Sequence, residues 1–125
     1  MTLTIVDRFC KYGEVNLQYL DNGEAHENPL PLLIVPGATE NADDYLPFLQ
    51  TLCRRVVALT LRGRYPSEAP ASRYSVEDHA GDIAALVKHL ALEHFALYAF
   101  SRGVSCALAY AVEHPERLEA LLLGD

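Results

Sequence analysis

The stretch from Leu97 to Ala111 (LYAFSRGVSCALAYA) constrains the fold more than any other part of the sequence. An apolar run from Phe95 to Ala99 leads to Ser101, and a segment of small residues with helical character follows. A strand that turns sharply at a serine and enters a helix is the layout of a nucleophile elbow, which holds the hydroxyl clear of the sheet. The amide dipoles of that helix favour an anion at the same place. A serine that only caps a helix after a buried strand fits the same letters, so both interpretations stay open.

The amino-terminal part of the chain predicts β structure. Short β-compatible runs at Arg8–Tyr12 and Val15–Leu20 flank the pair Gly13-Glu14, which predicts a β-hairpin. The residues from Asp21 to Pro31 are polar and rich in turn-forming types, and they predict a loop that contains His26.

Apolar runs then alternate with segments of helical character. The predicted strands are Leu32–Val35, Arg55–Leu61, Phe95–Ala99 and Leu118–Leu123. The predicted helices are one capped by Asn41, in which Pro47 requires either a late start or a kink, one that begins at Ser75, and one from Arg102 to about His114. This alternation predicts a single α/β domain over residues 1–125, with a predominantly parallel sheet, helices on both faces, and the hairpin in front.

The helix that begins at Ser75 has the clearest pattern. Ser75 and Asp78 predict a capping box. One apolar stripe suited to lie on a sheet is formed by Val76, Ala80, Ile83, Val87 and Leu90. His79 and His89 fall off this stripe, and we expect both to be surface histidines.

Composition excludes several function classes. With a net charge of −7 and an isoelectric point near 5.1, the chain is a poor match for nucleic acid or an anionic membrane surface. The first residues lack a long apolar run, so neither a signal peptide nor a membrane span is expected. Three scattered cysteines, without CxxC or Cys/His ligand spacing, predict a reducing, cytoplasmic setting and no metal site.

A flavodoxin-like or Rossmann-like ligand-binding domain has the same alternation of strands and helices. Such domains bind phosphates on Gly-rich turns, yet no GxGxxG follows the first parallel strand and no GxxxxGK occurs in the chain. A nucleotide or flavin binder is therefore the weakest of the alternatives.

Four segments resemble, in order, the amino-terminal half of the α/β-hydrolase fold family. They are LLIVPGATEN (strand and oxyanion loop), VVALTLRGRYPSEAP (strand and arginine motif), YSVEDHAGDIAALVKHL (helix) and ALYAFSRGVSCALAYAVEHPERLEALLLGD (elbow, helix and strand). The resemblance covers nearly the whole chain. It implies a serine hydrolase that acts on a small ester, thioester, lactone or amide, with no cofactor or metal.

Carried over by position, the resemblance makes Ser101 the nucleophile that forms an acyl-enzyme. The backbone N–H groups of Ala38 and Arg102 correspond to the oxyanion-hole donors. An aspartate nucleophile, as in dehalogenases, is excluded because the position is Ser101. Other positions depart from the family motifs, and assignment to lipases, dehalogenases or lactonases is unsafe. These departures are Pro36, Thr60, Tyr65, Ala99 and Val104.

The triad in this family runs in the order Ser, acid, His, and this chain lacks an evident base. His114 follows Ser101, but it lies at the far end of the predicted helix, roughly 20 Å away at 1.5 Å per residue. Asp125 ends a strand beside the elbow, where some members keep the acid, but it is the last residue. The acid and the His are therefore expected from outside these residues.

The predicted strand Leu118–Leu123 would form a leucine-rich edge of the sheet. Exposed edges of this kind pair with other chains, so we expect a homo-oligomer or a complementary half-chain that covers it. The missing base also supports a second reading, a non-catalytic α/β-hydrolase-like binding or interaction module.

Overall fold

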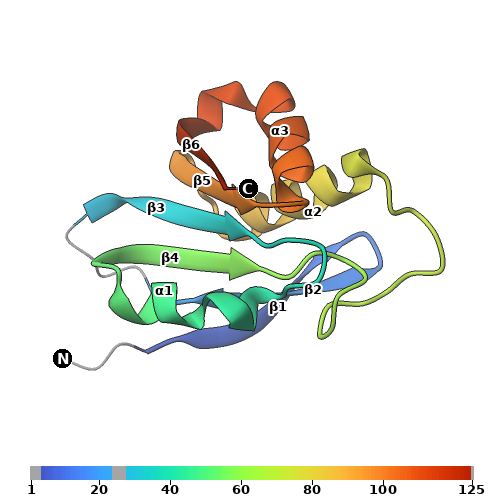
Figure 1. Ribbon diagram of the computed structural model, residues 1–125, viewed down its shortest axis with the longest axis horizontal. Helices are drawn as coiled ribbons and strands as arrows, with labels where there is room; N and C mark the ends of the chain where they lie inside the picture. The colour runs from blue at the N-terminus through green and yellow to red at the C-terminus, as the bar shows by residue number, and fades with distance from the viewer. Residues whose placement is uncertain (1–3, 24–27, 125) are drawn as a thin grey trace.

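A computed structural model describes residues 4–23 and 28–124 (Figure 1). The strands are β1 (Val6–Tyr12), β2 (Val15–Asp21), β3 (Asn28–Val35), β4 (Arg54–Leu59), β5 (Phe95–Phe100) and β6 (Leu118–Gly124). The helices are α1 (Leu46–Thr51), α2 (Val76–His89) and α3 (Gly103–Glu113), with 3₁₀ turns η1 (Ala42–Tyr45) and η2 (Pro115–Arg117). Over this part of the chain, no helix combines the length and apolarity needed to cross a bilayer.

The six strands form one sheet in the order β1-β2-β4-β3-β5-β6. The pairs β1–β2 and β2–β4 are antiparallel, whereas β4, β3, β5 and β6 run parallel to one another. This confirms the predicted hairpin followed by a parallel α/β sheet. Since the chain leaves β3 toward β4 and later returns on its other side to β5, the strand order reverses at β3, where α/β proteins place their ligands.

Local signals explain where the elements begin and end. Gly13 makes the hairpin turn with a φ of +60°, which a residue without Cβ adopts at no steric cost. Asn41 precedes η1, and Pro47 lies in the first turn of α1, as predicted. Strand β3 begins at Asn28, earlier than predicted, so the preceding loop is shorter; His26 of that loop lies outside the described residues.

Alternating strand residues pack into two cores on opposite faces of the sheet. Leu33 and Val35 of β3 belong to the core beneath α2 and α3, whereas Ile34 belongs to the core beneath α1. The two faces separate because successive side chains of a strand point in opposite directions. Helices therefore cover both faces, as the alternation predicts (Figure 1).

The buried face of α2 differs from the predicted stripe. The helix begins at the expected capping box, in which Ser75 Oγ accepts from the Asp78 N–H at 3.0 Å. Its buried residues are His79, Asp82, Ile83, Leu86 and Val87. The prediction that His79 is a surface residue is wrong, since its side chain is 7% exposed; His89 is exposed, as expected. Ile83 and Val87 of the predicted stripe lie in the core, and Ala80 and Leu90 pack against it partly buried. Apolar periodicity misses His79 and Asp82 because their side chains are polar.

Strand β6 lies at one edge of the sheet and pairs with β5 alone among the described strands. Leu121, Leu122 and Leu123 are 37–48% exposed. That this edge binds a second chain stays a prediction.

We expect the chain to self-associate in sedimentation velocity, and Leu122→Lys to shift it toward monomer, because a lysine on an edge strand opposes pairing. Phe9→Lys, at an exposed position on the opposite edge strand β1, is the matched control and should leave the distribution unchanged. A monodisperse wild-type monomer would contradict the expectation.

Candidate active site

Ser101 occupies a sharp turn between β5 and α3. Its φ is +55°, a left-handed conformation that costs a residue with a side chain about 1–3 kcal/mol. The turn is held on both sides: the Ser101 N–H donates to the Gly124 carbonyl of β6 at 2.9 Å, and the Ser101 carbonyl accepts from the Val104 N–H at 3.0 Å. The serine itself is exposed. Strand, strained serine and helix therefore follow one another as the sequence predicts.

Small residues let this turn approach the loop after β3. A Cβ on Gly103 would lie 2.5 Å from the Pro36 carbonyl oxygen and 2.7 Å from that of Val35. A Cβ on Gly37 would lie 3.5 Å from the Cβ of Ser101. The start of α3, Ser101 and the loop after β3 are thus in direct contact at the carboxyl end of the parallel strands.

The loop after β3 is ordered by Glu40. Its Oε1 accepts from the Gly37 N–H and from the Tyr45 hydroxyl, both at 2.7 Å. Burial, together with this bond to a carboxylate, raises the pKa of Tyr45. Within the described residues, no acceptor is assigned to the backbone N–H of Ala38 or of Arg102. The N–H of Arg102, next to Ser101 in the chain, and the N–H of Ala38, in the loop after β3, are therefore free donors in this part of the structure.

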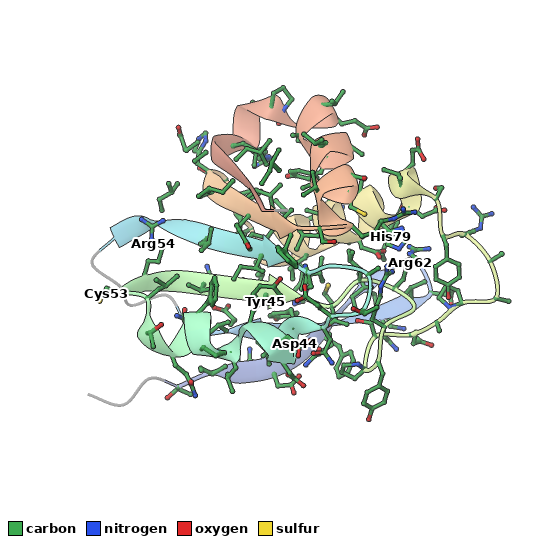
Figure 2. The ribbon with its side chains drawn as sticks, viewed as in Figure 1. Asp44, Tyr45, Cys53, Arg54, Arg62 and His79 are labelled. Carbon is green, nitrogen blue, oxygen red and sulfur yellow. The ribbon has the colours of Figure 1, made fainter. Side chains whose placement is uncertain are left out.

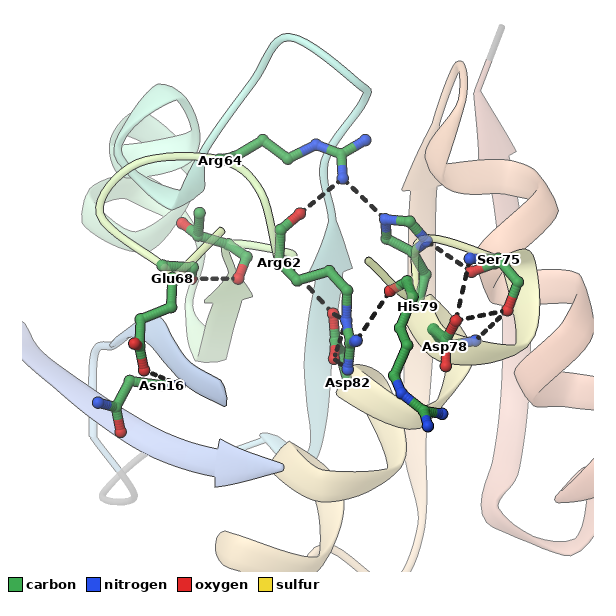
Figure 3. A network of polar contacts seen from close by, with 11 residues as sticks. Asn16, Arg62, Arg64, Glu68, Ser75, Asp78, His79 and Asp82 are labelled. Atoms are coloured by element: carbon green, nitrogen blue, oxygen red, sulfur yellow. Dashed lines mark hydrogen bonds and ion pairs between the residues drawn. The ribbon is translucent and has the colours of Figure 1, made fainter. Parts of the chain in front are cut away.

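Arg64, in the loop after β4, connects this region to α2. Its Nε donates to the Ala38 carbonyl at 3.0 Å, and its Nη1 donates to the Arg62 carbonyl at 2.8 Å. The same Nη1 lies 2.8 Å from Nε2 of His79 (Figure 3). One guanidinium thus fixes the loops after β3 and β4 against the first turn of α2.

His79 is held by both ring nitrogens. Nδ1 lies 2.8 Å from the Ser75 carbonyl, which can only accept, so Nδ1 carries the proton and Nε2 accepts from Arg64. Figure 2 shows His79 beside Arg62, at the end of the sheet toward which β3 and β4 point. Because the Nε2 lone pair is already used, this histidine is not free to take a proton from Ser101.

A cavity of about 370 Å³ opens beside the serine turn. We call it the arginine pocket, because Arg64 and Arg102 line it, together with Ala38, His79 and Cys106. Sequence reasoning missed this pocket. It combines residues from the loops after β3 and β4 with residues from α2 and α3, and no single motif contains them.

Beneath the arginine pocket lies a buried ion pair between Arg62 and Asp82. Their side chains are 3% and 0% exposed, and Nη2 of Arg62 lies 2.8 Å from Oδ1 of Asp82. The Arg62 Nε and backbone N–H also donate to Asp82 at 3.0 Å. Burial opposes the charge of Arg62, but the hydrogen bonds and charge of Asp82 outweigh it and raise the arginine pKa. Arg62 therefore has a structural role, since its guanidinium is buried against Asp82.

Thr60 stands where the resemblance places an aspartate, and it has a role of its own. Its Oγ1 accepts from the Ala42 N–H at 2.8 Å and donates to Gln18 Oε1 at 2.6 Å. The carbonyl of Thr60 accepts from the Ser67 hydroxyl at 2.6 Å. A hydroxyl in place of a carboxylate therefore still ties β2, η1 and the loop after β4 together.

The histidine and the acid that the sequence leaves open as triad partners do not complete the site among the described residues. His114 follows the far end of α3, as predicted, and its ring stacks on Tyr110 with 4.7 Å between the ring centroids. Asp125 lies outside the described residues. Across residues 4–23 and 28–124, no three His, Cys, Asp or Glu side chains gather in a way that could hold a metal ion.

The family model for the alpha/beta hydrolase fold matches residues 31–123. The chain therefore belongs to the α/β-hydrolase family, and this membership overturns the flavodoxin-like alternative.

Individual relatives cover a range of hydrolytic activities. A 2-(acetamidomethylene)succinate hydrolase from Mesorhizobium japonicum is 28% identical over 122 residues, or 96% of this chain and 42% of that protein. A Mycoplasma pneumoniae protein provisionally named a proline iminopeptidase is 39% identical, over 84% of this chain and 38% of that protein. An epoxide hydrolase structure from Vigna radiata matches with a TM-score of 0.84 at 25% identity, over 95% of this chain and 38% of that one. The chain thus spans about two fifths of the length of these relatives.

Proposed function

We propose that the protein is the amino-terminal portion of a serine hydrolase that acts on a small ester, thioester, lactone or amide through an acyl-enzyme on Ser101. The observation that carries the proposal is the exposed, left-handed Ser101 together with the free backbone N–H groups of Ala38 and Arg102. Hydrolytic names among the relatives support the reaction class and leave the substrate open.

In this mechanism, Ser101 Oγ forms a bond to the carbonyl carbon while its proton passes to a histidine outside this chain. The carbonyl electron pair moves to oxygen, where the N–H groups of Ala38 and Arg102 donate to the new anion. Collapse of the tetrahedral intermediate expels the alkoxide, thiolate or amine, which takes up the proton. Water then releases the acyl group by the same steps, and Ser101 recovers its proton.

The histidine and the acid would come from a continuation of the same fold or from a complementary chain. His79 does not fill the role, because Arg64 occupies its Nε2. Loss of the histidine from such a triad lowers kcat on the order of a million-fold, and the oxyanion hole and binding leave a residue of catalysis. The chain by itself is therefore expected to be a weak catalyst, although it contains the serine turn and the two backbone donors.

A non-catalytic binding module is the second candidate, and the engagement of both His79 nitrogens favours it. Under this hypothesis the same pocket binds a small molecule and no acyl-enzyme forms.

Intact mass spectrometry after incubation with an alkyl fluorophosphonate separates the two candidates. With the carboxyl-terminal portion supplied, we expect one adduct on the wild-type chain and none on Ser101→Ala, because the added histidine would activate Ser101, which lies next to the free N–H of Arg102. Ser105→Ala is the matched control: Ser105 is also exposed but lies inside α3, and its loss should not change labelling. No adduct on the wild type, also when the carboxyl-terminal portion is supplied, would overturn the hydrolase in favour of the binding module.

A further inference from the structure

The arginine pocket is positively charged, whereas the chain as a whole is negatively charged. Although the chain has a net charge of −7, the pocket is lined by two arginines and no carboxylate. Arg62 beneath it is neutralised by Asp82, whereas no carboxylate lies within ion-pair distance of Arg64 or Arg102 in the described part of the chain. Two cations therefore face a small cavity without counter-charge.

Arg64 presents unused donors to this cavity. Of its five guanidinium N–H groups, one on Nε and two on Nη1 point to Ala38, Arg62 and His79. Nη2 has no assigned acceptor among the described residues, so its two N–H groups remain free. The other contacts hold the guanidinium plane in place, and an incoming anion would therefore meet a preorganised donor.

Cys106 gives a second indication that both cations reach the cavity. Burial raises the pKa of its thiol, but the charges of Arg64 and Arg102 both act in the opposite direction. Cys106 lines the cavity together with Arg64 and Arg102, so the thiol and both guanidinium groups border the same space.

The remaining wall suits a short carbon chain. Tyr74 and Val76 also line the cavity, and its volume of about 370 Å³ is at the small end for ligand sites. Ala38 and Arg102, which flank Ser101, also line it. A molecule with an acyl carbon at the serine could therefore place a second group a few bonds away among the arginines.

We propose that the arginine pocket binds a carboxylate carried by the substrate, so that the hydrolase acts on a short acyl compound bearing a free carboxyl group. This inference rests on the proposed function for its connection to Ser101. The planar, two-oxygen carboxylate matches the free guanidinium edge of Arg64, and Arg102 supplies the second charge.

The test is an NMR titration of the 125-residue chain with monomethyl glutarate, followed through its amide resonances. We expect saturable shifts at Ala38, His79 and Arg102, and no saturable shifts with dimethyl glutarate, which has the same carbon chain without the charge. Arg102→Gln should weaken binding about tenfold or more, as expected for loss of a charged hydrogen bond. Arg8→Gln removes one charge from an exposed position on β1 and should leave binding unchanged.

Four results would overturn the inference: no saturable binding of monomethyl glutarate, equal binding of the dimethyl ester, equal weakening by Arg8→Gln, or tighter binding of inorganic phosphate, which would make the pocket a phosphate site. The titration is independent of acyl transfer. Labelling of Ser101 without glutarate binding would refute the inference alone, whereas glutarate binding without labelling would refute the hydrolase and keep the pocket.

Discussion

Asp82→Ala is expected to lower the free energy of unfolding by about 3–5 kcal/mol, because it leaves the buried guanidinium of Arg62 without its counter-charge. The effect is large because Arg62 connects several parts of the fold. Its Nη1 donates to the Arg73 carbonyl at 2.9 Å, and its guanidinium lies 5.4 Å from the ring centre of Tyr12 on the hairpin. Urea unfolding followed by circular dichroism measures the change.

Glu77→Ala is the control for Asp82→Ala, since Glu77 is an exposed acid on the same helix, and its loss should cost no more than about 0.5 kcal/mol. The double variant Arg62→Met/Asp82→Leu should recover most of the stability, because it removes both charges and keeps the volume. A cost below 1 kcal/mol for Asp82→Ala would show that the pair is not a stabilising connection.

Gly103→Ala is expected to destabilise the protein by about 1–3 kcal/mol and to abolish labelling of Ser101. The new Cβ would meet the carbonyl oxygens of Pro36 and Val35 at 2.5 and 2.7 Å. Both atoms belong to the main chain and cannot rotate away, so the start of α3 must move and take the serine turn with it. Urea unfolding and intact mass after fluorophosphonate treatment measure the two effects.

The sign of the Gly103→Ala effect is the decisive part of this prediction. Alanine is a better helix former than glycine by about 1 kcal/mol, so a helix without the close contact would be stabilised. A stabilised variant that still labels at Ser101 would therefore disprove the close approach of α3 to β3. Ser105→Ala, two residues further into α3, should keep both stability and labelling.

Much of the fold could be predicted because local and global signals agree. Continuous apolar runs, Gly13 in the hairpin turn and Pro47 in a late-starting helix each specify one local structure, and their order specifies a parallel sheet. Helix α2 is the exception. Its buried face includes His79 and Asp82, whose polar groups are satisfied by Arg64 and Arg62 across the chain. The spacing of His79 and Asp82, three residues apart and next to the apolar stripe, was the one signal in the sequence that both could lie on the buried face of α2.

Some residues of the candidate site could likewise be predicted from the sequence, and others could not. Ser101, Ala38 and Arg102 could be named from the sequence because each lies next to the end of a predicted strand, where motif and position coincide; their catalytic roles stay predictions. The arginine pocket could not be named. The charge of the pocket depends on the fact that Asp82 of α2 pairs with Arg62 and leaves Arg64 without an acidic partner among the described residues. This pairing arises from contacts between α2 and the loop after β4, which the sequence does not reveal.

The strand order also has a consequence for how the protein folds. The two free donors lie after β3 and β5, which are neighbours in the sheet although α1, β4 and α2 separate them along the chain. Distant pairing of this kind is slow, since the entropy of closing the intervening loop is lost before the contact forms. The serine turn is therefore expected to become ordered late in folding, after the β3–β4 half of the sheet, and to lose its amide protection first when the protein opens.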